Sequence, residues 1–190
     1  MFNAKTVDKF LTEDQSSYIV GLISKYDYWE INSDNGFWDR RVMNVATVKD
    51  KFEPELFALI EDTTNKIKKF IENEFNLTEE IYPDVSTICR WFPGMEQPPH
   101  ADDMTNTEVK GLEHRIFGSI IYLNTDYSGG KTYYPNYNQE ITPEVGKLAV
   151  HPGDVDHLHG VTKIEDGIRY TIAAFWSHDK EKSIDWSLYK

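Results

Sequence analysis

The sequence predicts a mainly β fold in which an antiparallel, double-sheet jelly roll is buttressed by N-terminal α-helices. Short apolar segments separated by Gly, Pro, Asn and Asp dominate after residue 83, whereas helical periodicity is confined to the first 82 residues. The five Trp, eleven Tyr and ten Phe residues also favour half-buried strands over a helical bundle. A length of 190 residues suits one domain, expected as helical support over 1–82 and a jelly-roll core over 83–178.

Two amphipathic helices are expected in the N-terminal part. The first covers about residues 12–25, where Thr12 and Gln15 match a capping box and apolar residues recur at helical spacing. The second covers about residues 53–76, with Pro54 in its first turn and a continuous apolar face. These helices are expected to pack against a sheet.

Five β-rich segments follow, each bounded by turn-forming residues. They cover residues 85–92, 117–124, 131–134, 147–151 and 169–176. Runs of this length and spacing are typical of a sandwich or barrel. Residues 32–50, between the two helices, show no sustained period, so this segment could be a strand pair or a flap.

Charge and cysteine content restrict the function classes. Thirty-two acidic against twenty basic residues give a formal net charge of −12, which opposes binding to nucleic acid or to an anionic membrane. A single cysteine, Cys89, cannot form an internal disulfide and suits a reducing compartment. Without a signal-peptide pattern or a bilayer-spanning run, the expected location is the cytoplasm.

His100 and Asp102 form an H-x-D triplet that could bind a metal ion. On a strand, residues two apart project from the same face, so both side chains can reach one ion. The triplet alone is a weak signal, but it follows a strand and a Pro-rich turn, a place where rigid scaffolds present functional residues. Asp103 is the competing carboxylate, and it would face the other way if the strand continues.

A third ligand must come from further along the chain. The downstream candidates are His151, His157, His159 and His178. Spacing does not separate His157 from His159 by face, but the Gly160-Val161 pair and the turn before the next strand favour His159. His151 and His157 are interpreted as partly buried histidines hydrogen-bonded to the backbone, and His114 and His178 as solvated residues.

Arg169 begins an alternating apolar run. Alternation places Arg169, Thr171 and Ala173 on one face and Tyr170, Ile172, Ala174 and Trp176 on the other. The small and polar neighbours of Arg169 suggest that its face lines a cavity. A buried guanidinium needs an anion, which could be a structural carboxylate or a bound ligand, and the nearby metal ligands favour the ligand.

Several motifs together resemble one known superfamily. They are W-F-P-G-M-E-Q-P-P-H-A-D at 91–102, I-Y-L-N at 121–124, G-G-K-T at 129–132, H-G-V at 159–161 and G-I-R-Y at 167–170. In order and spacing, over about residues 85–176, they resemble the iron(II)- and 2-oxoglutarate-dependent dioxygenases, and most of all the prolyl 4-hydroxylase branch. One departure is that Trp91 and Phe92 lie where prolyl hydroxylases commonly carry a tyrosine near the cosubstrate.

The resemblance implies a distorted, cupin-like jelly roll, a double-stranded β-helix, with Fe(II) held by His100, Asp102 and His159. It implies that 2-oxoglutarate and O2 are consumed, that succinate and CO2 are released and that a C–H bond is hydroxylated, with ascorbate as a possible further requirement. The branch suggests a prolyl residue in a peptide or protein as substrate. A free amino acid or small metabolite remains an alternative, as does a non-enzymatic metal-binding jelly-roll module. No oligomeric state is predicted.

The resemblance also implies how the cosubstrate binds. Arg169 would pair with the distal carboxylate of 2-oxoglutarate, and Tyr122 would donate its hydroxyl to the same group. Thr132 or Thr171 could add a hydrogen bond, although ordinary strand packing also explains both threonines. Trp38, Trp91, Tyr133, Tyr134 and Tyr137 could form an aromatic substrate groove, and the segments 36–41 and 104–115 could act as mobile covers.

Overall fold

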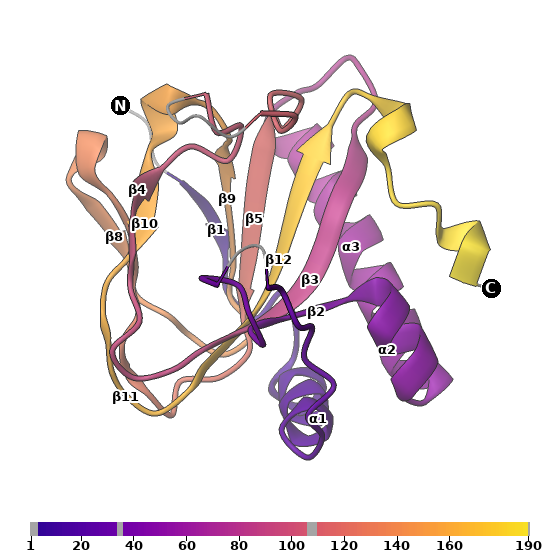
Figure 1. The fold of residues 1–190 in the computed structure, drawn as a ribbon. Coiled ribbons are helices and arrows are strands. Elements are labelled where there is room, and N and C mark those ends of the chain that lie inside the picture. Colours follow the sequence, from indigo (N-terminus) through magenta and orange to yellow (C-terminus); the bar gives the residue numbers. More distant parts are fainter. Residues whose placement is uncertain (1–3, 34–35, 106–109, 190) are drawn as a thin grey trace.

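The computed structural model describes residues 4–33, 36–105 and 110–189, and there it contains two facing antiparallel sheets with helices on one side (Figure 1). The larger sheet consists, in spatial order, of β1 (Lys5–Val7), β9 (Leu148–Pro152), β5 (Phe117–Tyr122), β12 (Arg169–Ser177), β3 (Tyr82–Trp91) and β2 (Val42–Asn44). The smaller sheet consists of β4 (Gln97–His100), β10 (His159–Val161), β7 (Thr132–Tyr134) and β8 (Gln139–Ile141), while β6 (Ser128–Gly129) pairs with β11 (Ile164–Asp166). The predicted jelly-roll fold class is confirmed.

The two predicted helices are present as α1 (Glu13–Ile23) and α3 (Pro54–Glu74). Both bonds of the predicted capping box form: the backbone N–H of Gln15 donates to Thr12 Oγ1 at 3.1 Å, and the Thr12 N–H donates to Gln15 Oε1 at 3.0 Å. None of the helices in the described part of the chain is long and apolar enough to cross a membrane.

The segment 32–50, expected as a strand pair or a flap, contains no strand pair among its described residues. Its described residues contain one strand, β2, followed directly by helix α2 (Val45–Lys51). Asn44 caps this helix by accepting a hydrogen bond from the Thr47 N–H at 2.9 Å. Seven residues make only two helical turns, too few to produce a recognisable apolar period.

Strands β1 and β2 show that the first 82 residues also contribute to the larger sheet. Each forms one of its edges, β1 against β9 and β2 against β3. Each has only three residues, so alternation of polar and apolar side chains could not reveal it in the sequence.

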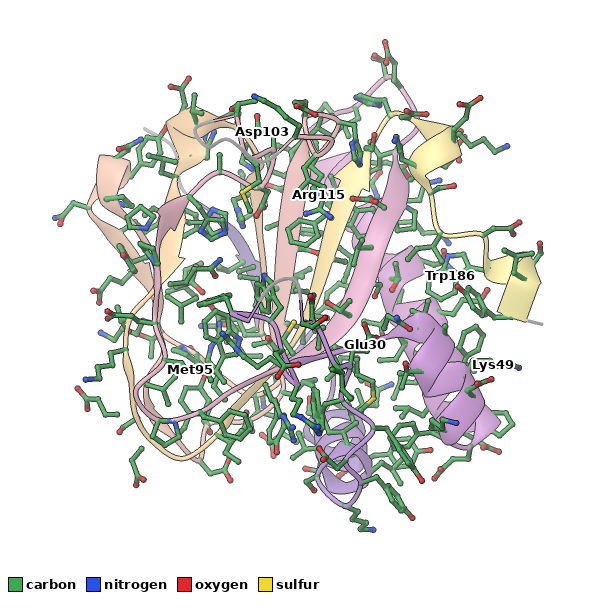
Figure 2. All side chains as sticks on the ribbon, viewed as in Figure 1. Glu30, Lys49, Met95, Asp103, Arg115 and Trp186 are labelled. Atoms are coloured by element: carbon green, nitrogen blue, oxygen red, sulfur yellow. The ribbon has the colours of Figure 1, made fainter. Side chains whose placement is uncertain are left out.

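The main hydrophobic core lies between the helices and one face of the larger sheet. It joins Ile19 and Ile23 of α1, several residues of α3, and Ile172 and Trp176 of β12. Figure 2 places Lys49 and Trp186 on this helical side, away from the smaller sheet. The C-terminal tail packs there as well, because the rings of Trp186 and Tyr189 lie 5.8 and 6.1 Å from that of Phe57.

Strand β12 separates the core from the interior of the jelly roll, as its alternation predicts. Tyr170, Ile172, Ala174 and Trp176 belong to the core, whereas Arg169, Thr171, Ala173 and Phe175 line a cavity on the opposite face. The strand pairs with β3 on one side and β5 on the other, so its position is fixed along its length. The packing of the helices therefore holds the cavity wall in place.

Asn124 fixes the beginning of β12. Its side-chain amide donates to the Ile168 carbonyl at 2.7 Å, and its Oδ1 accepts from the Tyr170 N–H at 2.8 Å. These bonds join the Asn124 side chain, which follows β5, to the backbone on both sides of Arg169.

Replacing Asn124 with alanine should lower the free energy of unfolding by about 2 kcal/mol, because it leaves a buried N–H and a carbonyl without partners. Urea unfolding followed by circular dichroism measures this loss. Asn136, an exposed residue with one hydrogen bond to the Asp156 carbonyl, is the matched control and should lose less than about 0.5 kcal/mol on the same substitution. Equal effects at both positions would contradict the role given to Asn124.

Candidate metal and cosubstrate site

The pairing of β4 with β10 brings together the three predicted metal ligands. His100 and His159 are direct cross-strand partners, and Asp102 lies two residues beyond His100, just after β4 ends. One nitrogen or oxygen atom from each of these three side chains lies within 4.8 Å of the other two. Among the described residues, this is the one group of three or more such side chains that could hold a metal ion.

The histidines point their Nε2 atoms toward the carboxylate. His159 Nε2 lies 3.4 Å and His100 Nε2 lies 3.8 Å from Asp102 Oδ1. The Nδ1 atoms lie near backbone carbonyls, that of His100 3.2 Å from the Pro98 oxygen and that of His159 3.3 Å from the His157 oxygen. A proton on Nδ1 would leave the Nε2 lone pair free, which is the tautomer that binds a metal.

The surroundings keep His100 and Asp102 in the protonation states that a metal requires. Burial, aided by the neighbouring His159, lowers the pKa of His100 to about 4, so its imidazole is neutral at pH 7. Burial alone would raise the pKa of Asp102. The nearby His159, which also hydrogen-bonds the carboxylate, and His151 outweigh this effect and lower the pKa of Asp102 to about 2. These two side chains thus offer a neutral imidazole and an ionised carboxylate, which suit a divalent transition metal.

Asp103 is excluded as the carboxylate ligand by its local bonding. Its Oδ1 accepts from the backbone N–H and the hydroxyl of Thr105, at 3.0 and 2.8 Å, and its own N–H donates to the Gly153 carbonyl. Figure 2 shows Asp103 on the loop at one end of the jelly roll. The chain turns after Ala101, so Asp102 alone points inward and is buried.

The other histidines have different surroundings. His157 lies 2.6 Å from Asp154 Oδ1 and stacks on Tyr137, which separates it from the metal-binding group. His178 is exposed, and its Nδ1 lies 2.9 Å from the Glu80 carbonyl oxygen. His114 is partly buried beside Asp84 and is therefore not simply solvated.

The prediction for His151, a partly buried histidine hydrogen-bonded to the backbone, is wrong. This residue is fully buried in the site, and neither ring nitrogen has a hydrogen-bond partner in the described structure.

The three metal-binding side chains open into a cavity inside the jelly roll. Its volume, measured as the space open to the centre of a water-sized sphere, is about 70 Å³. Besides the three, its walls carry apolar side chains from β3, β5, β10 and β12 together with Gln97, His151, Thr171 and Arg169. The arrangement leaves one side of the metal-binding group facing free space, as a site that must admit further ligands requires.

Arg169 is buried in the wall of this cavity with 1% of its surface exposed. Among the described residues Arg169 forms no ion pair with a carboxylate, and its Nε and Nη2 atoms have no hydrogen-bond partner. The ring centroids of Tyr122 and Trp91 lie 5.2 and 5.4 Å from it. A buried guanidinium without a structural carboxylate favours a bound anion as its partner.

Hydroxyl groups gather near Arg169. Tyr122 is fully buried and donates its hydroxyl to Thr132 Oγ1 at 2.7 Å. Tyr127 lies in the loop after β5, and burial raises its pKa to about 12 although Arg169 opposes the shift. Thr171 is buried beside Tyr122, its direct partner across β5 and β12. Tyr127 was not predicted, because a single tyrosine in a turn-rich loop carries no sequence signal.

The predicted aromatic groove is not continuous. Trp38 and Trp91 line the cavity, and Phe37 joins them at ring distances of 4.9 and 5.8 Å. The predicted tyrosines are dispersed: Tyr133 lines a separate surface hollow, Tyr134 is buried against His151 and His159, and Tyr137 stacks on His157. Of the two segments proposed as covers, 36–41 lies at the cavity wall, whereas 104–115 falls partly outside the described residues.

Arg41 organises the aromatic part of this wall. Its guanidinium lies 4.1 Å from the Trp91 ring centroid and 4.2 Å from that of Phe37, and it donates to the Phe37 carbonyl at 2.7 Å. Burial lowers the pKa of Arg41 to about 10, which still leaves it charged at pH 7. A charged guanidinium between aromatic faces holds Phe37 and Trp91 in fixed positions.

Comparisons with known proteins agree with this geometry. The family model of the 2OG-Fe(II) oxygenase superfamily matches residues 87–178. Prolyl 3-hydroxylase 1 of Mus musculus is 25% identical over 144 residues, covering 64% of this chain and 20% of that protein. A putative prolyl 4-hydroxylase of Acanthamoeba polyphaga mimivirus is 27% identical over 137 residues, covering 62% of this chain and 54% of that protein. The chain thus spans between a fifth and about half of these relatives.

Solved structures share the fold over nearly the whole chain. The viral collagen prolyl hydroxylase of Paramecium Bursaria Chlorella virus-1, in complex with 2OG, has a TM-score of 0.70 at 16% identity and covers 93% of this chain and 96% of its own. A Trichoplax adhaerens prolyl hydroxylase bound to a peptide of hypoxia inducible factor has a TM-score of 0.71 at 16% identity. This match covers 94% of the present chain and 85% of that protein's chain. Over residues 87–178 the chain is thus similar to the 2OG-Fe(II) oxygenase superfamily, its relatives in sequence are prolyl hydroxylases by name, and it carries a His-Asp-His group that could hold a metal ion.

Proposed function

We propose that this protein is an iron(II)- and 2-oxoglutarate-dependent dioxygenase that hydroxylates a C–H bond and releases succinate and CO2. The observation that carries the proposal is one cavity with three metal-binding side chains and a buried Arg169 that lacks a protein carboxylate. A purely structural metal site would have a fourth protein ligand and no need of a buried cation. The non-enzymatic binding module is therefore the weaker account.

The residues fit the iron and the cosubstrate. His100, Asp102 and His159 would hold Fe(II) on one face and leave the opposite face open to other ligands. When bound, the iron and 2-oxoglutarate supply the oxidising chemistry that amino-acid side chains lack. Arg169 would bind the distal carboxylate of 2-oxoglutarate through paired N–H donors.

The neighbouring hydroxyls would complete the cosubstrate pocket. Tyr122 could turn its hydroxyl from Thr132 toward the carboxylate held by Arg169, and Thr132 and Thr171 lie close enough in the fold to support it. Trp91, Ala173 and Phe175 make the rest of the wall apolar, which keeps water away from the reacting atoms. The chain's own contribution is thus to bind, orient and exclude solvent.

The proposed substrate is a prolyl residue in a peptide or protein. Support comes from the relatives, which are prolyl hydroxylases by name and include one bound to a peptide. The Phe37, Trp38 and Trp91 rings at the cavity wall offer an apolar surface for a pyrrolidine ring. A free amino acid or small metabolite is the second candidate substrate for the same chemistry, and the net charge of −12 disfavours a nucleic acid.

Anaerobic addition of Fe(II) and 2-oxoglutarate should produce a weak visible charge-transfer band. His159→Ala should abolish this band, because it removes one of three ligands. His157→Ala is the matched control: the two histidines are two residues apart and the side chain of His157 faces Asp154, so the band should persist. A band that survives His159→Ala, or is absent from the unaltered protein, would favour the binding-module alternative.

Arg169→Ala should raise the 2-oxoglutarate concentration required for half-maximal turnover about tenfold to hundredfold, because charge-assisted hydrogen bonds are lost far from the metal. Iron affinity, measured separately by calorimetry, should change little. Arg90→Ala is the control, since Arg90 is a partly buried arginine that pairs with Asp27 and is not part of the cavity lining. Unchanged cosubstrate dependence in Arg169→Ala would refute the assigned role.

Succinate release should be stimulated by proline-containing peptides more than by free proline or other free amino acids. Mass spectrometry of the stimulating peptide should show one added oxygen atom on a prolyl residue. Stimulation by a free amino acid alone, with its hydroxylated product, would replace the peptide assignment by the metabolite assignment while leaving the reaction class intact.

A further inference from the structure

His151 is a buried polar residue of the cavity wall that the proposed reaction does not use. It lies on β9, is 1% exposed, and neither Nδ1 nor Nε2 has a hydrogen-bond partner among the described residues. A buried polar group without a partner destabilises the folded state, so a residue of this kind requires an explanation.

The two oxygens of Asp102 face different neighbours. His159 and His100 approach Oδ1, whereas His151 Nε2 lies 3.8 Å from Oδ2. Asp102 Oδ2 is itself buried and without a hydrogen bond. His151 Nε2, which can carry an N–H, thus faces Asp102 Oδ2, and both atoms are buried without a hydrogen-bond partner. Their separation is slightly longer than a hydrogen bond.

The position of His151 argues against a role as a fourth metal ligand. Its nitrogens lie outside the group of three whose ligand atoms are all within 4.8 Å of one another. Its ring packs instead against His159, at a centroid distance of 4.0 Å, and against the edge of Tyr134 at 5.5 Å. These contacts hold the imidazole on the Oδ2 side of the carboxylate.

Gly118 leaves the space that this pair occupies. It lies directly opposite His151 in the β5–β9 ladder, and a Cβ atom there would fall 2.0 Å from Asp102 Oδ2 and 2.8 Å from His151 Cε1. Any other residue at position 118 would push the two groups apart. Glycine at position 118 therefore leaves the room that His151 needs to approach Asp102.

We propose that His151 is a positioning residue whose Nε2–H donates to Asp102 Oδ2 when a divalent ion is bound at Oδ1. This rests on the proposed function, because the ion is the one held by His100, Asp102 and His159. A shift of about 1 Å closes the bond. With Oδ2 held by His151, the carboxylate binds the ion through one oxygen, which keeps a coordination position available. Outer partners of this kind orient a ligand and raise its affinity for the metal.

The test measures Mn(II) affinity by calorimetry in the absence of 2-oxoglutarate and substrate. His151→Phe keeps a ring of similar size but removes the donor, so affinity should fall about tenfold to hundredfold. The metal-free variant should melt at the same or a higher temperature, because an unpartnered polar group is gone. His151→Gln, which carries an amide N–H near the Nε2 position, should recover most of the affinity.

The visible spectrum of Co(II) gives a second readout. It reports the coordination number, and it should change in His151→Phe if Oδ2 becomes free to bind the ion, but not in His151→Gln. His151→Met provides a second apolar variant, so that the result does not depend on one substitution.

Unchanged Mn(II) affinity and Co(II) spectrum in both apolar variants would overturn the positioning role. His159→Ala separates this failure from a failure of the proposed function: if His159→Ala still abolishes Mn(II) binding, the metal site stands and His151 is only a packing residue. Equal loss of affinity in His151→Phe and His151→Gln would also overturn the proposal, because the donor would then be irrelevant.

Discussion

The antiparallel pairing of β4 with β10 is the constraint on which the rest of the site depends. It sets His100 and His159 side by side from segments almost sixty residues apart, and the turn that ends β4 directs Asp102 between them. A slip of β4 by one residue in this register would turn His100 to the outside of the sheet, whereas β10 would remain paired with β7. The metal-binding group is therefore a property of the strand pairing more than of any single loop.

The larger sheet serves two purposes through its two faces. The helices cover one face of this sheet (Figure 1). That face joins them in a continuous apolar core, and the opposite face lines the cavity. Strand β12 shows this division most clearly, because Arg169 and Ile172 lie three residues apart on opposite sides of the same sheet. The core offsets the free-energy cost of keeping Arg169 and His151 buried with polar atoms unpartnered, as is common where a site must receive a ligand.

Much of this arrangement could be predicted from the sequence. The H-x-D triplet, the glycine after His159 and the alternation around Arg169 each reflect local backbone geometry, and the structure brings their side chains into one cavity. The strands β1 and β2 and the helix α2 were missed because they are too short to show a period. The surroundings of His151 were predicted wrongly, and Tyr127 was not predicted at all. Both residues are surrounded by strands and loops distant in sequence, which residue spacing does not reveal.

We infer that one cavity holds a metal ion at the His-Asp-His group and a dicarboxylate against Arg169. Anomalous diffraction from crystals grown with Mn(II) and 2-oxoglutarate without oxygen tests both parts at once. We expect a single strong anomalous peak within bonding distance of His100 Nε2, Asp102 Oδ1 and His159 Nε2, with the distal carboxylate of 2-oxoglutarate on the Arg169 guanidinium. A peak elsewhere, or Arg169 paired with a carboxylate of the protein, would contradict it.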